Sequence, residues 1–427
     1  MASKERILLL AEDTKFQLTA RVLYGNCDFY KMAERYVTLS ELHVKSFGVN
    51  NFEFYSSPGR IEVCGNHTDH NNGKVLCASI TVDTLGAVTA LDDNSIKIAS
   101  QGYPVIDVNL DNLDKVAREE GTSTALVKGV VRYLKERGYA IGGFVATTTS
   151  SVFKGAGVSS SASFELFVAE ILSSIYNGGK IDAVTKAKAA QWAESYYFNK
   201  PCGLMDQSAI ALGGISYIDF ASSENPLIEH IDWIFNDLDI ILINTGGDHS
   251  ALTSHYSAIR AEMEAISSYF GKKVLREVER DVFYGSLSKL KELYSGRAIL
   301  RAIHYYEENA RVELCAQAVR DGDSDAFVNI INQSGDSSYK LLQNCYAPED
   351  TTQCIPLAIE LARRICGVKG VRVHGGGFAG TVIVFASSDN TEDICSKLIE
   401  LYGDNNVYTV RVRNSGATGT GLKFIKE

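Results

Sequence analysis

Residues 58–73 read PGRIEVCGNHTDHNNG and bring one arginine, one glutamate, two histidines, one aspartate and three asparagines into one short stretch. The first part alternates polar and apolar residues, so Arg60, Glu62 and Cys64 would share one face of a strand. The remainder is rich in asparagine, histidine and glycine and suits neither a strand nor a helix. A loop of this composition needs a partner that uses both charge and many hydrogen bonds.

The chain has 427 residues, too many for one compact core, so we expect two packed domains. A hydrophobic content of 45% and a charged content of 22% are typical of a soluble globular protein. The 42 lysines and arginines are outnumbered by 52 aspartates and glutamates, which gives a net charge of −10. This acidic balance argues against sequence-independent nucleic-acid binding but permits a phosphorylated small ligand in a locally basic pocket.

The nine cysteines are odd in number and none forms a CxxC pair, so we expect reduced thiols rather than a disulfide framework or a zinc site. The first residues, MASKERILLLAEDTK, contain an apolar run of only four residues before charge resumes. This pattern predicts neither a signal peptide nor a membrane span. We therefore expect a cytoplasmic monomer or weak homo-oligomer with no membrane or nucleic-acid partner.

Strand and helix patterns alternate in both halves of the chain, which predicts two α+β domains. Residues 1–45 look helical and form an N-terminal extension, residues 46–225 form the first domain, and residues 226–427 form the second. Short strand patterns, among them FEFYSS and RIEVC, open the first domain. Apolar spacing predicts helices over 122–138 and from about 160 to 176.

The loop GAGVSSSAS (155–163) leads into the apolar run FELFVAEILSSIY. Glycines that let backbone approach a ligand, hydroxyl groups and a helix N-terminus together make an anion site. A serine-rich helix cap is the alternative interpretation. The loop is not a Walker A motif, because no Gly-Lys-Ser/Thr follows at the required spacing.

The run GGGFAG (375–380) matches the pattern G-x-G-x-x-G. A dinucleotide site would need a helix next, but the strand pattern TVIVFAS follows, so we reject that interpretation. What remains is a glycine-rich turn between two strands, which either brings backbone close to a ligand or is simply a tight hairpin.

Isolated polar residues elsewhere give weaker signals. Asp206 follows a glycine near the end of a helix that carries Glu194, and an aspartate in a turn is most often a cap or solvated. His67 and His70 are three residues apart, but without further ligands in register they do not predict a metal site.

Five segments, in order along the chain, together resemble the galactokinases of the GHMP small-molecule kinase superfamily. PGRIEVCGNHTDHNNG resembles the galactokinase signature, KGAGVSSSASFEL the phosphate-loop motif, and VRVHGGGFAGTVIVF the C-terminal glycine motif. NKPCGLMDQ resembles the segment of the catalytic aspartate, and GGDHSALTSHYSAIR that of a sugar-contacting tyrosine. The resemblance implies an α+β, two-domain GHMP kinase fold, with a ribosomal S5 domain 2-like N-terminal domain and a ferredoxin-like C-terminal domain.

The resemblance also implies an ATP-dependent sugar 1-kinase that moves the γ-phosphate of MgATP to the anomeric hydroxyl of a hexose. Its cofactors would be ATP and Mg²⁺, and its catalytic residues Arg60 and Asp206. The implied sugar-binding residues are Asn66, His67, Asp69, Gly203 and Tyr256. The implied nucleotide-binding residues are Gly155, Ala156, Gly157, Val158, Ser159, Ser160 and Ser161. The implied metal ligands are Ser161 and Glu194.

The sugar loop departs from the family pattern at several positions. Asn66 stands where galactokinases carry a glutamate that grips the 6-hydroxyl of galactose, and Glu62 stands where they carry asparagine. His70 replaces the usual tyrosine, and Phe153 replaces the proline that usually precedes the phosphate loop.

Two interpretations of these departures are open. Either the two positions have exchanged roles and galactose remains the substrate, which we favour, or the lost anion admits a C6 carboxylate and the enzyme is a galacturonate 1-kinase. A third, less favoured hypothesis is a non-catalytic sugar and ATP sensor. The serine run, Arg60 and Asp206 are intact, which argues against the sensor.

Overall fold

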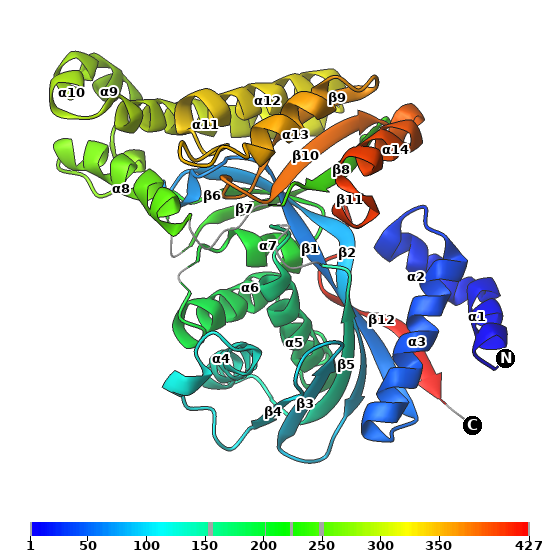
Figure 1. Cartoon of the computed structure of the whole chain (residues 1–427). Helices are drawn as coiled ribbons and strands as arrows, with labels where there is room; N and C mark the ends of the chain where they lie inside the picture. Colours follow the sequence, from blue (N-terminus) through cyan, green and yellow to red (C-terminus); the bar gives the residue numbers. More distant parts are fainter. Residues whose placement is uncertain (1, 153–156, 201, 223–224, 247–251, 426–427) are drawn as a thin grey trace.

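The computed structural model describes residues 2–152, 157–200, 202–222, 225–246 and 252–425. They form two β-sheets with helices on both faces and an N-terminal group of three helices beside the first sheet (Figure 1). Among these residues, no helix is both long and apolar enough to cross a membrane. The nine cysteines are all free thiols.

The first sheet has eight strands, and six of them follow the order β12-β1-β2-β5-β3-β4. β6 pairs with β2, and β7 pairs with β6; only the β3–β5 pairing is parallel among the described strands. The strands are β1 (Asn51–Cys64), β2 (Lys74–Ala90), β3 (Ser95–Ser100), β4 (Ile106–Asn109), β5 (Phe144–Ser150), β6 (Ile215–Asp219), β7 (Leu227–Ile231) and β12 (Thr418–Ile425).

Side chains alternate between the two faces along each strand, and helices cover both faces of this sheet. On β2, Leu85 and Ala87 pack with the N-terminal helices, whereas Val88 packs with α4 and α5. Gly86 is required on the α5 side, because a Cβ there would lie 2.2 Å from the Phe167 ring. The helices of this half are α1 (Ala2–Glu12), α2 (Thr14–Tyr24), α3 (Phe29–Phe47), α4 (Ser123–Glu136), α5 (Ser160–Tyr176), α6 (Ala183–Trp192) and α7 (Met205–Leu212).

The second sheet has four antiparallel strands in the order β11-β8-β10-β9. They are β8 (Leu238–Asn244), β9 (Val368–His374), β10 (Thr381–Ser387) and β11 (Val407–Val410). The helices of this half are α8 (Thr253–Tyr269), α9 (Arg280–Gly285), α10 (Leu287–Leu293), α11 (Gly296–Asp321), α12 (Ser324–Ser337), α13 (Cys354–Arg363) and α14 (Thr391–Tyr402).

Short 3-10 and π turns complete the described chain. The 3-10 turns are η1 (Asp69–Asn71), η2 (Ala117–Glu119), η4 (Leu275–Glu277), η6 (Ser388–Asn390) and η7 (Asp404–Asn406). The π turns are η3 (Ala193–Tyr197) and η5 (Ser338–Leu342), each of which directly continues an α-helix.

One hydrophobic cluster joins the two sheets. It contains Ile61 and Leu76 of the first sheet, Ile383 and Phe385 of the second, and Val312 of α11 between them. Because these side chains are buried on all sides, the two halves of the molecule share a core at this point. The loop after β1 is thereby held against the glycine turn after β9.

The expected helices at 122–138 and 160–176 are confirmed as α4 and α5, and the segment from 252 to 366 is mainly helical. FEFYSS and RIEVC form one strand, β1, rather than two. The domain boundary near residue 225 stays a prediction. Two strands from beyond it, β7 and β12, lie in the first sheet, and neither was expected from the sequence.

A buried carboxylate fixes the N-terminal helices to the sheet. Asp83 of β2 is fully buried and accepts hydrogen bonds from Tyr24 of α2 at 2.9 Å, from Arg35 of α3 at 2.6 Å, and from Ser56 of β1. Arg413, close to the C-terminal strand, lies 3.9 Å from the same carboxylate and donates to Ser56 Oγ at 2.7 Å. The cluster therefore joins both ends of the described chain to the centre of the first sheet.

Replacing Asp83 by asparagine leaves Arg35 and Arg413 without their shared negative charge. Loss of one partner of a buried pair is costly, so we expect D83N to lower the free energy of unfolding by roughly 3 kcal/mol in urea titrations. The matched control is D393N, which breaks the exposed Lys397–Asp393 pair on α14 and should cost less than about 0.5 kcal/mol. Equal effects of the two substitutions would contradict this account.

Candidate active site

Two neighbouring cavities meet between the two sheets. The first cavity, of about 790 Å³, is lined by residues of the 58–73 segment, of the region around Gly203 and of the turn at Gly375. The second cavity, of about 510 Å³, is lined by the loop before α5, by Asp206 and by His374. Arg60 and Gly376 line both cavities, so a group bound in one can reach a group bound in the other at this point.

Arg60 and Asp206 form a bidentate ion pair where the two cavities meet. Arg60 lies in the middle of β1, and its Nε and Nη2 donate to the two carboxylate oxygens of Asp206 at 2.7 and 2.8 Å. Ser159 Oγ also donates to Asp206. Burial alone would raise the pKa of Asp206, but the charge and hydrogen bonds of Arg60, together with Ser159, lower it overall. Asp206 is therefore a carboxylate at neutral pH.

The position of Asp206 differs from the expectation in one respect. It does not follow the helix of Glu194 directly, because that helix ends in η3 and Asp206 lies in the first turn of α7. Asp206 does lie at the site, as the sequence predicted. Helix α7, which the sequence did not predict, directs its carboxylate toward Arg60.

The loop before α5 has the backbone of an anion site. Gly157 and Ser159 both have positive φ, 66° and 61°, and the helix begins at Ser160. The side chain of Ser159 makes no capping bond and turns to Asp206, which favours the anion-site interpretation over a serine-rich cap. Val158 is buried, and its carbonyl accepts from the Arg60 backbone N–H at 3.1 Å.

The predicted nucleotide-binding residues fall into two groups. Gly155 and Ala156, like Phe153 before them, lie outside the described residues. The remaining five line the second cavity: Gly157, Val158, Ser159, Ser160 and Ser161.

Ser161 and Glu194 lie together beside the second cavity. Ser161 Oγ donates to Glu194 Oε1 at 2.8 Å, and Lys200 Nζ and Gln207 Nε2 donate to the same carboxylate, each at 2.8 Å. A hydroxyl and a carboxylate are oxygen ligands of the kind that Mg²⁺ prefers, and a nucleotide-bound Mg²⁺ needs few protein ligands. The two residues therefore fit the metal that the resemblance implies. Within the described ranges, no cluster of three or more His, Cys, Asp or Glu has metal-binding geometry.

The loop after β1 lies at the first cavity. His67 has a positive φ of 57°, and its Nε2 donates to the Gly376 carbonyl at 3.0 Å. Asp69 opens the η1 turn beside Gly203, where an added Cβ would lie 3.1 Å from its Oδ2. Burial raises the pKa of Asp69, the nearby charge of Asp206 adds to the increase, and His67 opposes it. Four of the five predicted sugar-binding residues thus line this cavity: Asn66, His67, Asp69 and Gly203.

Tyr256 lies beside the second cavity. It lines the second cavity, donates to the Gly377 carbonyl at 2.7 Å, and packs edge-on against Phe378 with ring centres 5.2 Å apart. The structure therefore brings the tyrosine to the glycine turn that separates the two cavities rather than into the first cavity.

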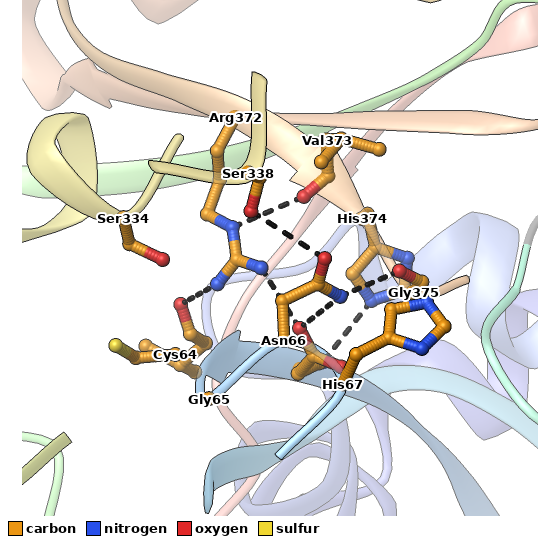
Figure 2. Close-up of polar contacts among 12 residues, drawn as sticks. Cys64, Gly65, Asn66, His67, Ser334, Ser338, Arg372, Val373, His374 and Gly375 are labelled. Carbon is orange, nitrogen blue, oxygen red and sulfur yellow. Dashed lines mark hydrogen bonds and ion pairs between the residues drawn. The ribbon is translucent and has the colours of Figure 1, made fainter. Parts of the chain in front are cut away.

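Asn66 and Glu62 belong to a buried network with Arg372 of β9. Arg372 donates to Glu62 Oε1 at 2.8 Å, and Asn66 Nδ2 donates to the same oxygen at 2.9 Å and to the Gly375 carbonyl at 2.6 Å. Asn344 Nδ2 donates to Asn66 Oδ1 at 2.7 Å. Figure 2 shows Arg372 reaching from β9 to the Asn66 loop. The amide of Asn66 is thus bonded to protein at both ends, while the Glu62 carboxylate lines the first cavity with Oε1 held in place.

Sequence reasoning missed Arg372 and His374. Both precede the glycine run in VRVHGGG, and their spacing of two puts them on one face of β9. That face meets the end of β1 at Glu62 and Val63, so the alternation was an available signal. His304 of α11 had no such signal, because an isolated histidine on a long helix gives no indication of its partner.

His304 of α11 holds the loop after β1 in place at Asn66. Its Nε2 donates to the Asn66 carbonyl at 2.9 Å, and its Nδ1 accepts from Ser337 Oγ at 2.9 Å. Burial lowers the pKa of His304 to about 4, so the ring is neutral at physiological pH.

Comparisons with known proteins agree with this geometry. A model of the galactokinase galactose-binding signature matches residues 41–90, and a model of the GHMP kinase N-terminal domain matches residues 125–214. Galactokinase of Clostridium tetani is 27% identical over 85% of this chain and 91% of its own length. Galactokinase of Lactococcus lactis subsp. lactis is 29% identical over 82% of this chain and 88% of its own.

Solved structures give the same result. The crystal structure of Lactococcus lactis galactokinase complexed with galactose has a TM-score of 0.76, with 27% identity, over 90% of this chain and all of that one. Methanococcus jannaschii mevalonate kinase shares the fold at 14% identity, with a TM-score of 0.61 over 86% of this chain.

The fold and the phosphate loop define a GHMP kinase, which confirms the predicted α+β architecture. The matches over most of the chain are, within that superfamily, to galactokinases. It is a phosphotransferase with an alcohol group as acceptor.

The buried neutral state of His304 predicts a dependence of stability on pH. Its folded pKa, about 4, is below its unfolded value of about 6.5, so its contribution is complete above pH 6.5. Between pH 6.5 and 4 only the unfolded chain takes up the proton, and stability falls by up to roughly 3 kcal/mol.

We expect H304Q to be less stable at pH 7 but to lose correspondingly less stability over this pH range in denaturant titrations. The matched control is H230Q, at an exposed histidine on β7. A slope that is identical in wild type and H304Q would contradict the assignment.

Proposed function

We propose that the protein is an ATP-dependent galactose 1-kinase that converts galactose and ATP to galactose 1-phosphate and ADP. The observation that carries the proposal is the Arg60–Asp206 pair at the junction of the two cavities. The galactokinase relatives and the similarity to a galactokinase crystallised with galactose support the sugar.

The chemistry follows from what the side chains can supply. A bond forms between the anomeric oxygen and the γ-phosphorus as the bond to ADP breaks, and the hydroxyl proton goes to Asp206 or is oriented by it. Arg60 offers a fixed positive fork to the transferring group, and it keeps Asp206 ionised. Ser161 and Glu194 would hold the Mg²⁺ of MgATP, which neutralises phosphate charge when bound.

His67, Asp69 and Gly203 are the proposed sugar contacts in the first cavity, and Ser159 and Ser160 the proposed contacts to the ATP phosphates. The acidic composition supports an enzyme that does not bind nucleic acid, and the free cysteines support a cytoplasmic one.

Glu62 favours galactose over galacturonate. Its carboxylate lines the first cavity, and one oxygen is fixed by Arg372 and Asn66. A sugar hydroxyl can donate to such a carboxylate, whereas a uronate would bring a second anion beside it at a cost of several kcal/mol. Because the Asn66 amide is already bonded to protein, we propose Glu62 as the acceptor in place of Asn66. Galacturonate remains the second candidate, because Arg372 partly offsets the negative charge of Glu62 that would repel the uronate.

The substrate is tested by ADP release with galactose, galacturonate, N-acetylgalactosamine and glucose. We expect galactose to have the highest kcat/KM. No ADP above background with any of these sugars would favour the sensor, and a preference for galacturonate would favour the second candidate.

The catalytic roles are tested in the same assay. We expect D206N and R60A to lower kcat by about 10²- to 10⁴-fold, as is typical when one proton-transfer or electrostatic group is removed. D393N on exposed α14 is the matched control and should keep wild-type kcat. Wild-type turnover in D206N would remove Asp206 from the mechanism.

The role of Glu62 is tested by the selectivity of E62Q. The substituted amide keeps the shape of the side chain but removes the charge that a uronate would meet. The ratio of kcat/KM for galactose to that for galacturonate should therefore fall about tenfold or more, equivalent to about 1.4 kcal/mol. The ratio is measured within one variant, so partial unfolding cancels. An unchanged ratio would show that Glu62 does not contact the sugar.

A further inference from the structure

His374 lies between the two halves of the site and has no role in the chemistry above. It is the last residue of β9, immediately before the glycine turn, and is 2% exposed. It lines the second cavity together with Arg60, Asp206 and the serines of the phosphate loop. Its ring therefore reaches both strand β1, at Glu62, and the loop before α5, at Gly157.

The protonation state of the His374 ring follows from one hydrogen bond. Its Nε2 lies 3.0 Å from the backbone nitrogen of Glu62, and a backbone N–H can only donate, so Nε2 is the acceptor. Burial, followed by the positive charges of Arg60 and Arg372, lowers the pKa of His374 well below its usual value. The ring is therefore neutral, and its single proton lies on Nδ1.

The Nδ1–H group is a buried donor that lacks an acceptor among the residues the structure describes. It lies against the phosphate loop, where a Cβ added to Gly157 would be 3.3 Å from Nδ1. The carbonyl of Gly157 already accepts from Arg60. A buried N–H without an acceptor is unfavourable, and such groups in enzymes often await a ligand.

The surroundings determine which acceptor would suit this donor. Arg60, Lys200 and the N-terminus of α5 all favour negative charge in the second cavity. The absence of a side chain at Gly157 leaves Nδ1 next to the backbone that would carry the anion. An oxygen of the nucleotide phosphate chain satisfies both the charge and the missing hydrogen bond.

We propose that His374 is a phosphate-binding residue whose neutral Nδ1–H donates a hydrogen bond to the phosphate chain of the bound nucleotide. The proposal rests on the proposed function only in that ATP is the nucleotide. His374 keeps its proton throughout, because Nε2 is bonded to the backbone of Glu62 and the ring has no second site to relay it. His374 would therefore connect the backbone of β1 at Glu62 to the phosphates of the bound nucleotide.

Two substitutions separate the two bonds of the ring. The amide of glutamine reaches the position of Nε2 and can accept from Glu62 N–H, but it supplies no donor at Nδ1. The amide of asparagine supplies a donor near Nδ1 but does not reach Glu62. H374Q therefore keeps the structural bond and H374N keeps the proposed functional one.

We expect H374Q to weaken ATP binding and to lower kcat/KM for ATP by about 10- to 100-fold, the usual effect of losing a hydrogen bond to a charged group. H374N should remain within about fivefold of wild type. Binding of adenosine, which lacks the phosphate chain, should be the same in all three proteins. H230Q is the matched control for the substitution itself.

Binding of ATP and of adenosine is measured by calorimetry without sugar, so the result does not depend on which sugar is phosphorylated. If wild type phosphorylates no sugar, the proposed function fails while the calorimetry still decides the role of His374. If H374N binds ATP poorly and H374Q binds it normally, the ring serves only to hold Glu62, and the proposal is overturned. Equal, wild-type ATP affinity in both variants would overturn it as well.

Discussion

The site depends on the pairing of Arg60 with Asp206. Each charge would be costly to bury alone, and each is supplied by a different part of the chain, a central strand and the first turn of a helix. The pair keeps the carboxylate ionised and holds the guanidinium where the two cavities meet. Both functions require that β1 and α7 keep a fixed separation. The packing of α7 on β2 provides it, because Ala209 and Ile210 share a buried cluster with Val75, and β2 pairs with β1.

Buried ion pairs also join other parts of the molecule at two further places. Glu62 is paired with Arg372 where the two sheets meet, and Asp83 is held by Arg35 and Arg413 where the N-terminal helices join. Buried pairs of this kind contribute little net stability against well-packed apolar residues, but they tolerate only one relative placement of their elements. Three such pairs along β1 and β2 therefore specify geometry more than they add to stability.

Much of this arrangement could be predicted from the sequence. The spacing of PGRIEVC put Arg60 and Glu62 on one strand face, and the serine run before an apolar helix indicated an anion site at α5. The pairing partners could not be predicted in the same way. Arg372 and His374 act across a distance of more than 300 residues in the chain, and His304 is an ordinary helix residue until Asn66 is folded onto it. The π turn after α6 and the new helix at Met205 also left no periodic signal.

The outermost strand of the first sheet, β12, affects the order in which this sheet can form during protein synthesis. β1, which carries the arginine of the site, pairs on one side with β2 and on the other with β12, so that Asn51 lies opposite Ile425. A ribosome therefore releases nearly all of the described chain before β1 acquires its second neighbour, and until then one edge of that strand is open to wrong partners. The three N-terminal helices precede β1 in the chain and pack on the face that carries Phe52, Phe54 and Leu85, so that face can be covered before β12 arrives.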